Sequence, residues 1–247
     1  MKRKDFFEKD QLVHLISRAV DERKIFQNRD DCLRFMFQLY IANIGAPKHN
    51  FERGKINKIT EQLLRGGEIT ESDFITDRHE PFIYIIDFSL VMTHYHLYAI
   101  VNIENSVADF IGRLNNGFAK YFNLKHNRKG ALFGSRYKGV LINSDFQADA
   151  VSRYVSVINP LDVYQPGWRE RGIENYHKAL DFLETYEFSS FPDRIGKRKS
   201  KILTPAEVTE KYLPENNIKS EDYKSFVENF LQKNAKEEYD FNSLNFE

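Results

Sequence analysis

The chain has 247 residues, of which 41% are hydrophobic and 29% charged, a composition typical of a soluble globular protein. No apolar stretch approaches the roughly 20 residues that cross a bilayer, and the charged start MKRKDFFEKD lacks the apolar core of a signal peptide. We therefore expect a cytoplasmic protein with no membrane anchor. The single cysteine, Cys32, excludes intramolecular disulfides and cysteine-based zinc sites.

The formal net charge is zero, but the charges are unevenly distributed. Residues 201–247 hold six Lys and ten Asp or Glu, which leaves 30 basic and 26 acidic residues, a net charge of +4, in the first 200. A mildly basic body is compatible with a nucleic-acid partner. We expect residues 196–247 to form an acidic helical extension, which would serve as a dimerisation arm, a partner-binding segment or a shield over the basic surface.

Strand and helix patterns alternate along the first half of the chain. Residues 11–20 alternate as a strand does, and residues 30–44 have helical spacing, with Asp30 or Asp31 as the N-cap and Gly45 as the stop. Residues 46–81 are polar, with a short helix at 55–64, and we interpret them as an insertion or an elaborated connection. The apolar run that follows, to residue 101, predicts a strand or one long bent strand.

This run is interrupted once, by Thr93-His94-Tyr95-His96. Successive side chains of a strand point to opposite faces, so His94 and His96 share one face, about 6 to 7 Å apart, while Tyr95 packs on the other. A buried polar ring without a partner costs on the order of 1 to 3 kcal/mol. A divalent cation would satisfy both imidazoles; the alternative is that a carbonyl or water satisfies each.

The second half begins with an amphipathic helix at 106–126, with Ser106 as its cap. A strand follows at 140–142, and then a helix at 146–158 that Asn159-Pro160 should end. The elements predict an α+β fold with an antiparallel sheet and helices mainly on one face. Cations and aromatic rings alternate at 123–139, as expected of a nucleic-acid surface or of a solvated basic loop. With two cations of the preceding helix, the DNA-contact candidates are Arg113, Lys120, Lys125, Arg128, Lys129, Arg136, Tyr137 and Lys138.

Four stretches, in this order, resemble those of a known family: HLISRAVDERKIF, SLVMTHYHLYAIV, FAKYFNLKHNRKGALFGSRYKG and RYVSVINPLDV. Across residues 11–195 the chain resembles the HUH single-tyrosine transposases, and among them the REP-associated tyrosine transposases. The resemblance implies a ferredoxin-like catalytic domain, assigned to residues 1–195, that nicks single-stranded or hairpin DNA and transfers strands. It also implies Mg²⁺ or Mn²⁺ on His94 and His96, and Tyr154 as the nucleophile that forms a 5′-phosphotyrosine intermediate.

One spacing departs from the family pattern of a tyrosine, three residues and Asn-Pro. Here Ile158 is four residues after Tyr154, and Asn159 is five after it. Because Mg²⁺ prefers oxygen ligands, we expect a third, oxygen-bearing ligand. Either a helical bulge returns Asn159 to the site, or a water or an acidic residue such as Asp149 or Asp87 completes the shell, or the enzyme has decayed.

Three functions therefore stay open. The first is a metal-dependent nicking and strand-transfer enzyme. The second is a catalytically decayed nucleic-acid-binding protein or regulator that recognises hairpin DNA, in which Tyr154 merely packs. The third is a phosphodiesterase that uses water as its nucleophile. His14, in the first strand, is a structural residue or a neighbour of the metal ligands, and a homodimer is the candidate assembly.

Overall fold

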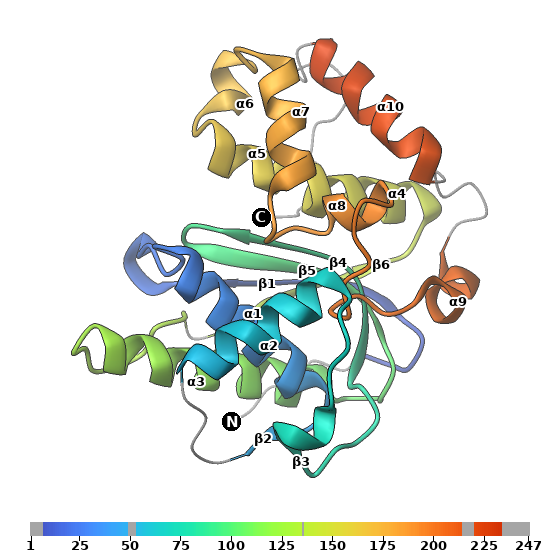
Figure 1. The fold of residues 1–247 in the computed structure, drawn as a ribbon. Helices are drawn as coiled ribbons and strands as arrows, with labels where there is room; N and C mark the ends of the chain where they lie inside the picture. The colour runs from blue at the N-terminus through green and yellow to red at the C-terminus, as the bar shows by residue number, and fades with distance from the viewer. Residues whose placement is uncertain (1–6, 49–52, 135, 214–219, 234–247) are drawn as a thin grey trace.

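A four-stranded antiparallel sheet in the order β4-β5-β1-β6 forms the centre of the molecule (Figure 1). The structure is a computed structural model that describes residues 7–48, 53–134, 136–213 and 220–233. The predicted insertion and the predicted C-terminal extension thus lie partly outside the described residues. The strands are β1 (Leu12–Arg18), β4 (Ile83–Val91), β5 (His94–Val101) and β6 (Lys138–Ile142).

Two long helices connect these strands in the β-α-β-β-α-β order of a ferredoxin-like domain. Helix α1 (Arg29–Ile44) follows β1, and α3 (Val107–Lys125) joins β5 to β6. The α+β prediction is confirmed. The caps differ from expectation: Asn28, not Asp30 or Asp31, caps α1 by accepting a hydrogen bond from the Asp31 N–H. The Ser106 side chain makes no cap hydrogen bond to α3 and donates to the Ile103 carbonyl instead.

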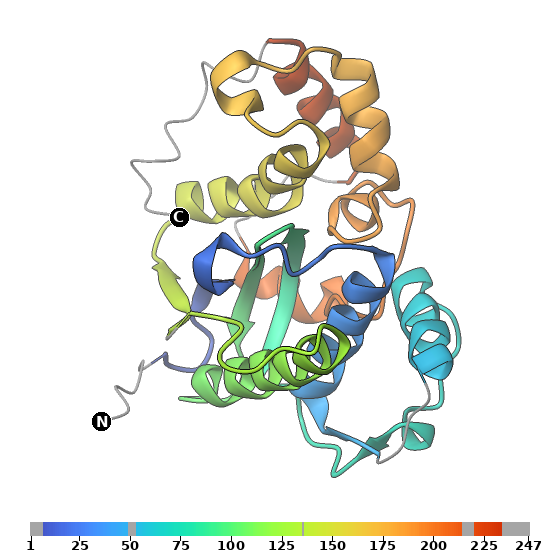
Figure 2. The same cartoon turned by 90° about the vertical axis from the view of Figure 1, so that its left-hand side faces the viewer.

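Helices cover both faces of the sheet, whereas the sequence predicted mainly one (Figures 1 and 2). Every residue of β5 is buried, because both of its faces are covered. Tyr95, Leu97 and Ala99 pack in one core with α1 and α3. On the other face, Tyr98 and Ile100 pack in a second core with helices that follow β6. Those helices include α4 (Asp145–Arg153), α5 (Asn159–Tyr164), α7 (Tyr176–Thr185) and α10 (Ser220–Gln232).

The apolar run that carries the two histidines is a hairpin, so the prediction of one long bent strand was wrong. β4 and β5 pair antiparallel and turn at Met92 and Thr93, with Val91 opposite His94. Both histidines lie on β5, two residues apart, and therefore on the same face. Tyr95 points to the opposite core, where its ring lies 4.7 Å from that of Phe35 between centroids.

The segment between α1 and β4 adds a small subdomain beside α1. Its elements are β2 (Ala46–Pro47), α2 (Arg53–Arg65), the 3-10 helix η2 (Glu71–Asp73) and β3 (Ile75–Thr76). Phe37 of α1 forms a third core with Ile56, Phe74 and Ile75.

The helix after β6 was predicted to end at Asn159-Pro160, but it continues past both residues. After α4 the chain forms one π-helical stretch, η3 (Tyr154–Ile158), and continues into α5. Pro160 lies in the first turn of α5, directly after the π-helical stretch.

The C-terminal region packs onto the sheet domain beyond the predicted boundary at residue 195. Its remaining elements are α6 (Trp168–Arg171), α8 (Phe191–Arg194), α9 (Ala206–Thr209) and the 3-10 helix η4 (Glu210–Tyr212). Near the other end of the chain, a short 3-10 helix, η1 (Val20–Glu22), follows β1. Thr204 exchanges hydrogen bonds with the Ile85 backbone, and Tyr223 of α10 is buried in the second core. Within the described ranges, we find no helix with the length and apolar character of a membrane span.

Candidate functional site

A third histidine joins the predicted pair on the same face of the sheet. β1 lies beside β5, with Ile16 opposite His96 and His14 opposite Tyr98. His14 Nε2 and His96 Nδ1 are 2.9 Å apart, and their rings stack with centroids 5.1 Å apart. The His94 and His96 rings meet edge to face at 4.8 Å. Three imidazoles are therefore in contact, where the sequence predicted two and left the place of His14 open.

Tyr154 lies over this cluster from the helical side. Its ring meets those of His14 and His96 edge to face, with centroids 5.9 and 5.5 Å apart. η3 carries Tyr154 and packs on β4 and β5, which brings the ring onto the histidine face. The side chain is only 1% exposed. The predicted nucleophile and the predicted ligand His96 are thus neighbours.

The π-helical stretch absorbs the extra residue between Tyr154 and Asn159. The backbone N–H of Asn159 donates to the Tyr154 carbonyl, five residues back, so one wider turn replaces the ordinary four-residue repeat. Asn159 is completely buried, and neither its amide oxygen nor its amide nitrogen has a hydrogen-bond partner among the described residues. The helix therefore contains a bulge, which was one of the predicted explanations of the longer spacing.

Arg169, which was not among the predicted site residues, contacts the Tyr154 ring. Its guanidinium carbon lies 5.4 Å from the centre of the Tyr154 ring. Two hydrogen bonds to the Asp162 carboxylate, of 3.1 and 2.7 Å, hold it. Burial opposes the charge, but Asp162 and the contact with Tyr154 raise the pKa of Arg169 above its ordinary value. No local motif marks Arg169, because it reaches the site from α6 only through the fold.

The imidazoles are neutral at pH 7. Burial lowers the pKa of His94 to about 3, and the charges of Arg18 and Arg169 act in the same direction. Burial likewise lowers the pKa of His14 to about 3, with Lys138 adding to the effect. The pKa of His96 is held well below its ordinary value, chiefly by burial. Neutral imidazole is the form that binds a metal ion.

The donor atoms fit part of a metal site. His96 Nε2 is buried and has no hydrogen-bond partner within the described ranges, and the amide oxygen of Asn159 is in the same state. His94 Nδ1 lies 2.9 Å from the Thr93 hydroxyl, which leaves its other nitrogen for a ligand bond. Among the described residues, no group of three or more His, Cys, Asp or Glu side chains is arranged to hold a metal ion. These nitrogen and amide atoms are the candidate donors, and none of them is a carboxylate oxygen.

One of the two acidic residues considered as third ligands is already occupied by other partners. The Asp87 carboxylate accepts hydrogen bonds from Arg194, Ser152 and Ser190. Asp149 is half-buried on α4; burial raises its pKa, and Arg153 and Arg194 oppose the rise. Asp87 is thus a structural anchor beneath the Tyr154 helix.

The DNA-contact candidates fall on two sides of the sheet. Lys138 pairs with Ile16 across β1 and β6 and so lies on the histidine face. Lys129 and Arg136 are exposed in the loop, whereas Arg128 donates to the Asn123 side chain and to loop carbonyls. Tyr137 packs half-buried against the α1 and α3 core rather than standing clear for a base. The other three lie on α3, away from the histidine face: Arg113, Lys120 and Lys125.

Comparisons with known proteins add one distant likeness. No family model and no curated protein matches the chain. Among solved structures, the chain is similar to the structure of a REP-associated tyrosine transposase bound to a REP hairpin. The TM-score is 0.44 at 11% sequence identity, over 83% of this chain and 91% of that one.

Proposed function

We propose that the chain nicks single-stranded DNA and transfers the strand, with Tyr154 as the nucleophile and a divalent metal as the cofactor. The observation that carries the proposal is the placement of the Tyr154 ring against both His14 and His96. A tyrosine on a helix and imidazoles on a strand form a rigid pair, which fixes the position of a scissile phosphate in advance.

The chain's own residues supply the activation of the nucleophile. A phenol has a reference pKa near ~10 and is mostly protonated at pH 7, so a cation beside it favours the phenolate. Arg169 is that cation, and Asp162 orients it. The Tyr154 oxygen forms a bond to phosphorus as the bond to the 3′ oxygen breaks. The phenol gives up its proton to solvent, and the 3′ oxygen leaves with the electron pair and takes up a proton from solvent, which yields a 5′-phosphotyrosine and a free 3′-hydroxyl.

His94, His96 and Asn159 are the residues that would hold the metal ion. Bound Mg²⁺ or Mn²⁺ would neutralise the phosphate oxygens as charge develops on them. The unpartnered His96 Nε2 and Asn159 amide support this assignment, because buried polar atoms without partners are rare in folded proteins. His14 would orient His96 through the contact at its other nitrogen.

Access of DNA to Tyr154 requires a movement, since the side chain is 1% exposed. The short helix α6, which carries Arg169, contacts the ring. Gly167 and Gly172 flank α6, with φ of 80° and 82°, a region that favours glycine. We place the opening at these two glycines, so that α6 swings aside and Arg169 returns when the phosphate is bound.

The burial of Tyr154 also favours a second candidate, a hairpin-binding protein that has lost cleavage. An adduct assay separates the two. The protein is incubated with labelled single-stranded hairpin DNA and Mn²⁺, and a covalent adduct is sought on a denaturing gel. Wild type should form the adduct and Tyr154→Phe should not, whereas Tyr98→Phe, a buried tyrosine on the same face, should keep it. Cleavage without an adduct would point to water as the nucleophile. If neither an adduct nor cleavage is seen, the hairpin-binding protein is the candidate that remains.

A further inference from the structure

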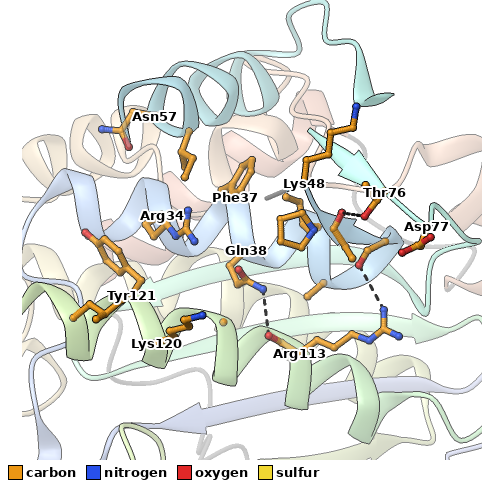
Figure 3. A pocket seen from close by; sticks show the side chains of 18 of the residues that line it. Arg34, Phe37, Gln38, Lys48, Asn57, Thr76, Asp77, Arg113, Lys120 and Tyr121 are labelled. Carbon is orange, nitrogen blue, oxygen red and sulfur yellow. Dashed lines mark hydrogen bonds between the residues drawn. The ribbon is translucent and has the colours of Figure 1, made fainter. Parts of the chain in front are cut away.

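A cavity of about 1240 Å³ lies on the side of α1 and α3 that faces away from the sheet (Figure 3). α1 contributes Arg34 and Phe37 to its lining, α3 contributes Lys120 and Tyr121, and Lys48 lines it directly after β2. α1 and α3 cover the face of the sheet opposite to His96 and Tyr154. The cavity is therefore separate from the candidate active site.

Arg34 is the unusual residue of this cavity. It makes no hydrogen bond or ion pair within the described residues, and its Nε atom is buried without a partner. The guanidinium carbon lies 5.6 Å from the centres of both the Phe37 and Tyr121 rings. Burial lowers the pKa of Arg34, because it removes water from the charged guanidinium. A half-buried cation without a carboxylate is an energetic cost that an anionic ligand would remove.

Three further cations of the lining form no ion pair with a described residue. Lys48 and Lys120 are exposed and form no ion pair with the described part of the chain. Arg113 donates hydrogen bonds to the Gly45 carbonyl and to His79, and its guanidinium lies over the Phe82 ring. Lys125 is different, because the buried Asp31 carboxylate neutralises it. The lining also includes the carboxylates of Asp30 and Asp77, and Asp30 accepts a hydrogen bond from Asn57. Basic side chains nevertheless outnumber acidic ones in the lining, and Figure 3 shows Arg34 and Lys120 on neighbouring helices.

The wall between α1 and α3 is built by a close approach. A Cβ atom on Gly117 would lie 2.3 Å from the Gln38 amide, so only glycine leaves room for this side chain. Gln38 donates to the Arg113 carbonyl across the two helices. The close approach at Gly117 and this hydrogen bond join the two helices that carry Arg34 and Lys120.

We infer that this cavity binds phosphate groups, and that their source is the backbone of a single-stranded nucleic acid. Arg34 lies over the faces of Phe37 and Tyr121, so these rings are not free to stack on bases. The cations of the cavity would therefore contact the phosphates of the nucleic-acid backbone. The volume exceeds the roughly 300 to 1,000 Å³ of small-molecule sites, which suits a segment of strand. The inference that the ligand is a nucleic-acid strand rests on the proposed function, whereas the inference that the cavity binds phosphate groups does not.

The test measures binding of a fluorescein-labelled oligothymidylate by fluorescence anisotropy in EDTA, where neither nicking nor metal contributes. Arg34→Gln and Lys120→Gln should each weaken binding several-fold. Each should also lower the slope of log affinity against log salt by about 0.7, the value for one phosphate contact on a single strand. Lys178→Gln, which removes an exposed charge on α7 outside the cavity, is the matched control and should bind as wild type does. Equal affinity of all four proteins would overturn the inference.

A second arm identifies the source of the phosphate. The thermal midpoint of wild type and of both cavity variants is measured with and without inorganic phosphate. If phosphate stabilises only wild type while the variants bind oligothymidylate normally, the inference that the ligand is a nucleic-acid strand is rejected. The ligand would then be a free phosphate compound. Because binding is measured without metal, a missing Tyr154 adduct would reject the proposed reaction and leave this result standing.

Discussion

His14 Nε2 lies 2.9 Å from His96 Nδ1, which leaves the Nε2 atom of His96 as the nitrogen without a partner in the described structure. A histidine ligand that loses the neighbour orienting it typically loses 10- to 100-fold in metal affinity, on the order of 1.4 to 2.7 kcal/mol. We therefore predict that His14→Ala raises the Mn²⁺ concentration needed for half-maximal adduct formation by about that factor. His14→Gln should recover part of the loss, because an amide also supplies a hydrogen bond. An unchanged Mn²⁺ dependence in His14→Ala would reject the positioning role.

Replacement of Asn159 should affect thermal stability and nicking activity in opposite directions. Both polar atoms of its amide are buried without partners among the described residues, and each unmet hydrogen bond costs about 1 to 3 kcal/mol. Asn159→Leu, of similar size, should therefore unfold at the same or a higher temperature than wild type while it loses metal-dependent nicking. Differential scanning calorimetry and the adduct assay measure the two effects. A variant that is destabilised and yet fully active would show that Asn159 only packs.

Much of this arrangement could be predicted from local patterns, and the rest depends on contacts between distant segments. The two-residue repeat of a β-strand correctly predicted that His94 and His96 share one face, because this repeat depends only on the local backbone. The hairpin turn at Met92 and Thr93 carries no Gly, Pro or Asn, so the sequence did not reveal it. The π-helical stretch was only one of three explanations, since helix period alone does not distinguish a bulge from a lost ligand. Arg169 could not be found at all, because α6 reaches Tyr154 through tertiary packing.

Arg169 should matter for the reaction more than for the fold. Its guanidinium lies over the Tyr154 ring, whereas Arg171, two residues on, is exposed and donates to the Pro166 carbonyl. We predict that Arg169→Met reduces the single-turnover rate of adduct formation by about 10²- to 10³-fold, the range for loss of one charge-stabilising donor. Arg171→Met, the matched control, should react within about twofold of wild type, as surface changes usually have small effects. Equal rates for the two variants would remove Arg169 from the chemistry.

Asp87 and Arg194 should account for a large part of the attachment of the C-terminal helices to the sheet. Arg194 of α8 makes hydrogen bonds of 2.9 and 2.6 Å to the completely buried Asp87 carboxylate of β4, and Ser152 of α4 donates to the same group at 2.8 Å. Breaking a buried pair leaves one charge without compensation and typically costs about 3 to 5 kcal/mol. At about 2 to 4 °C per kcal/mol for a chain near this size, Asp87→Asn or Arg194→Met should lower the thermal midpoint by roughly 6 to 20 °C.

The double variant tests the reason for that loss. With Asp87→Asn and Arg194→Met together, no uncompensated charge remains, so the double variant should lose less stability than the sum of the single variants. The Tyr154 helix rests on the same network through Ser152, two residues before the nucleophile. Adduct formation by the double variant should therefore fall even at temperatures where it is fully folded, because the hydrogen bonds that hold the helix on β4 are weakened. Strictly additive losses in unfolding free energy would mean that the two charges do not interact, and the account of how α4 and α8 are held on the sheet would fail.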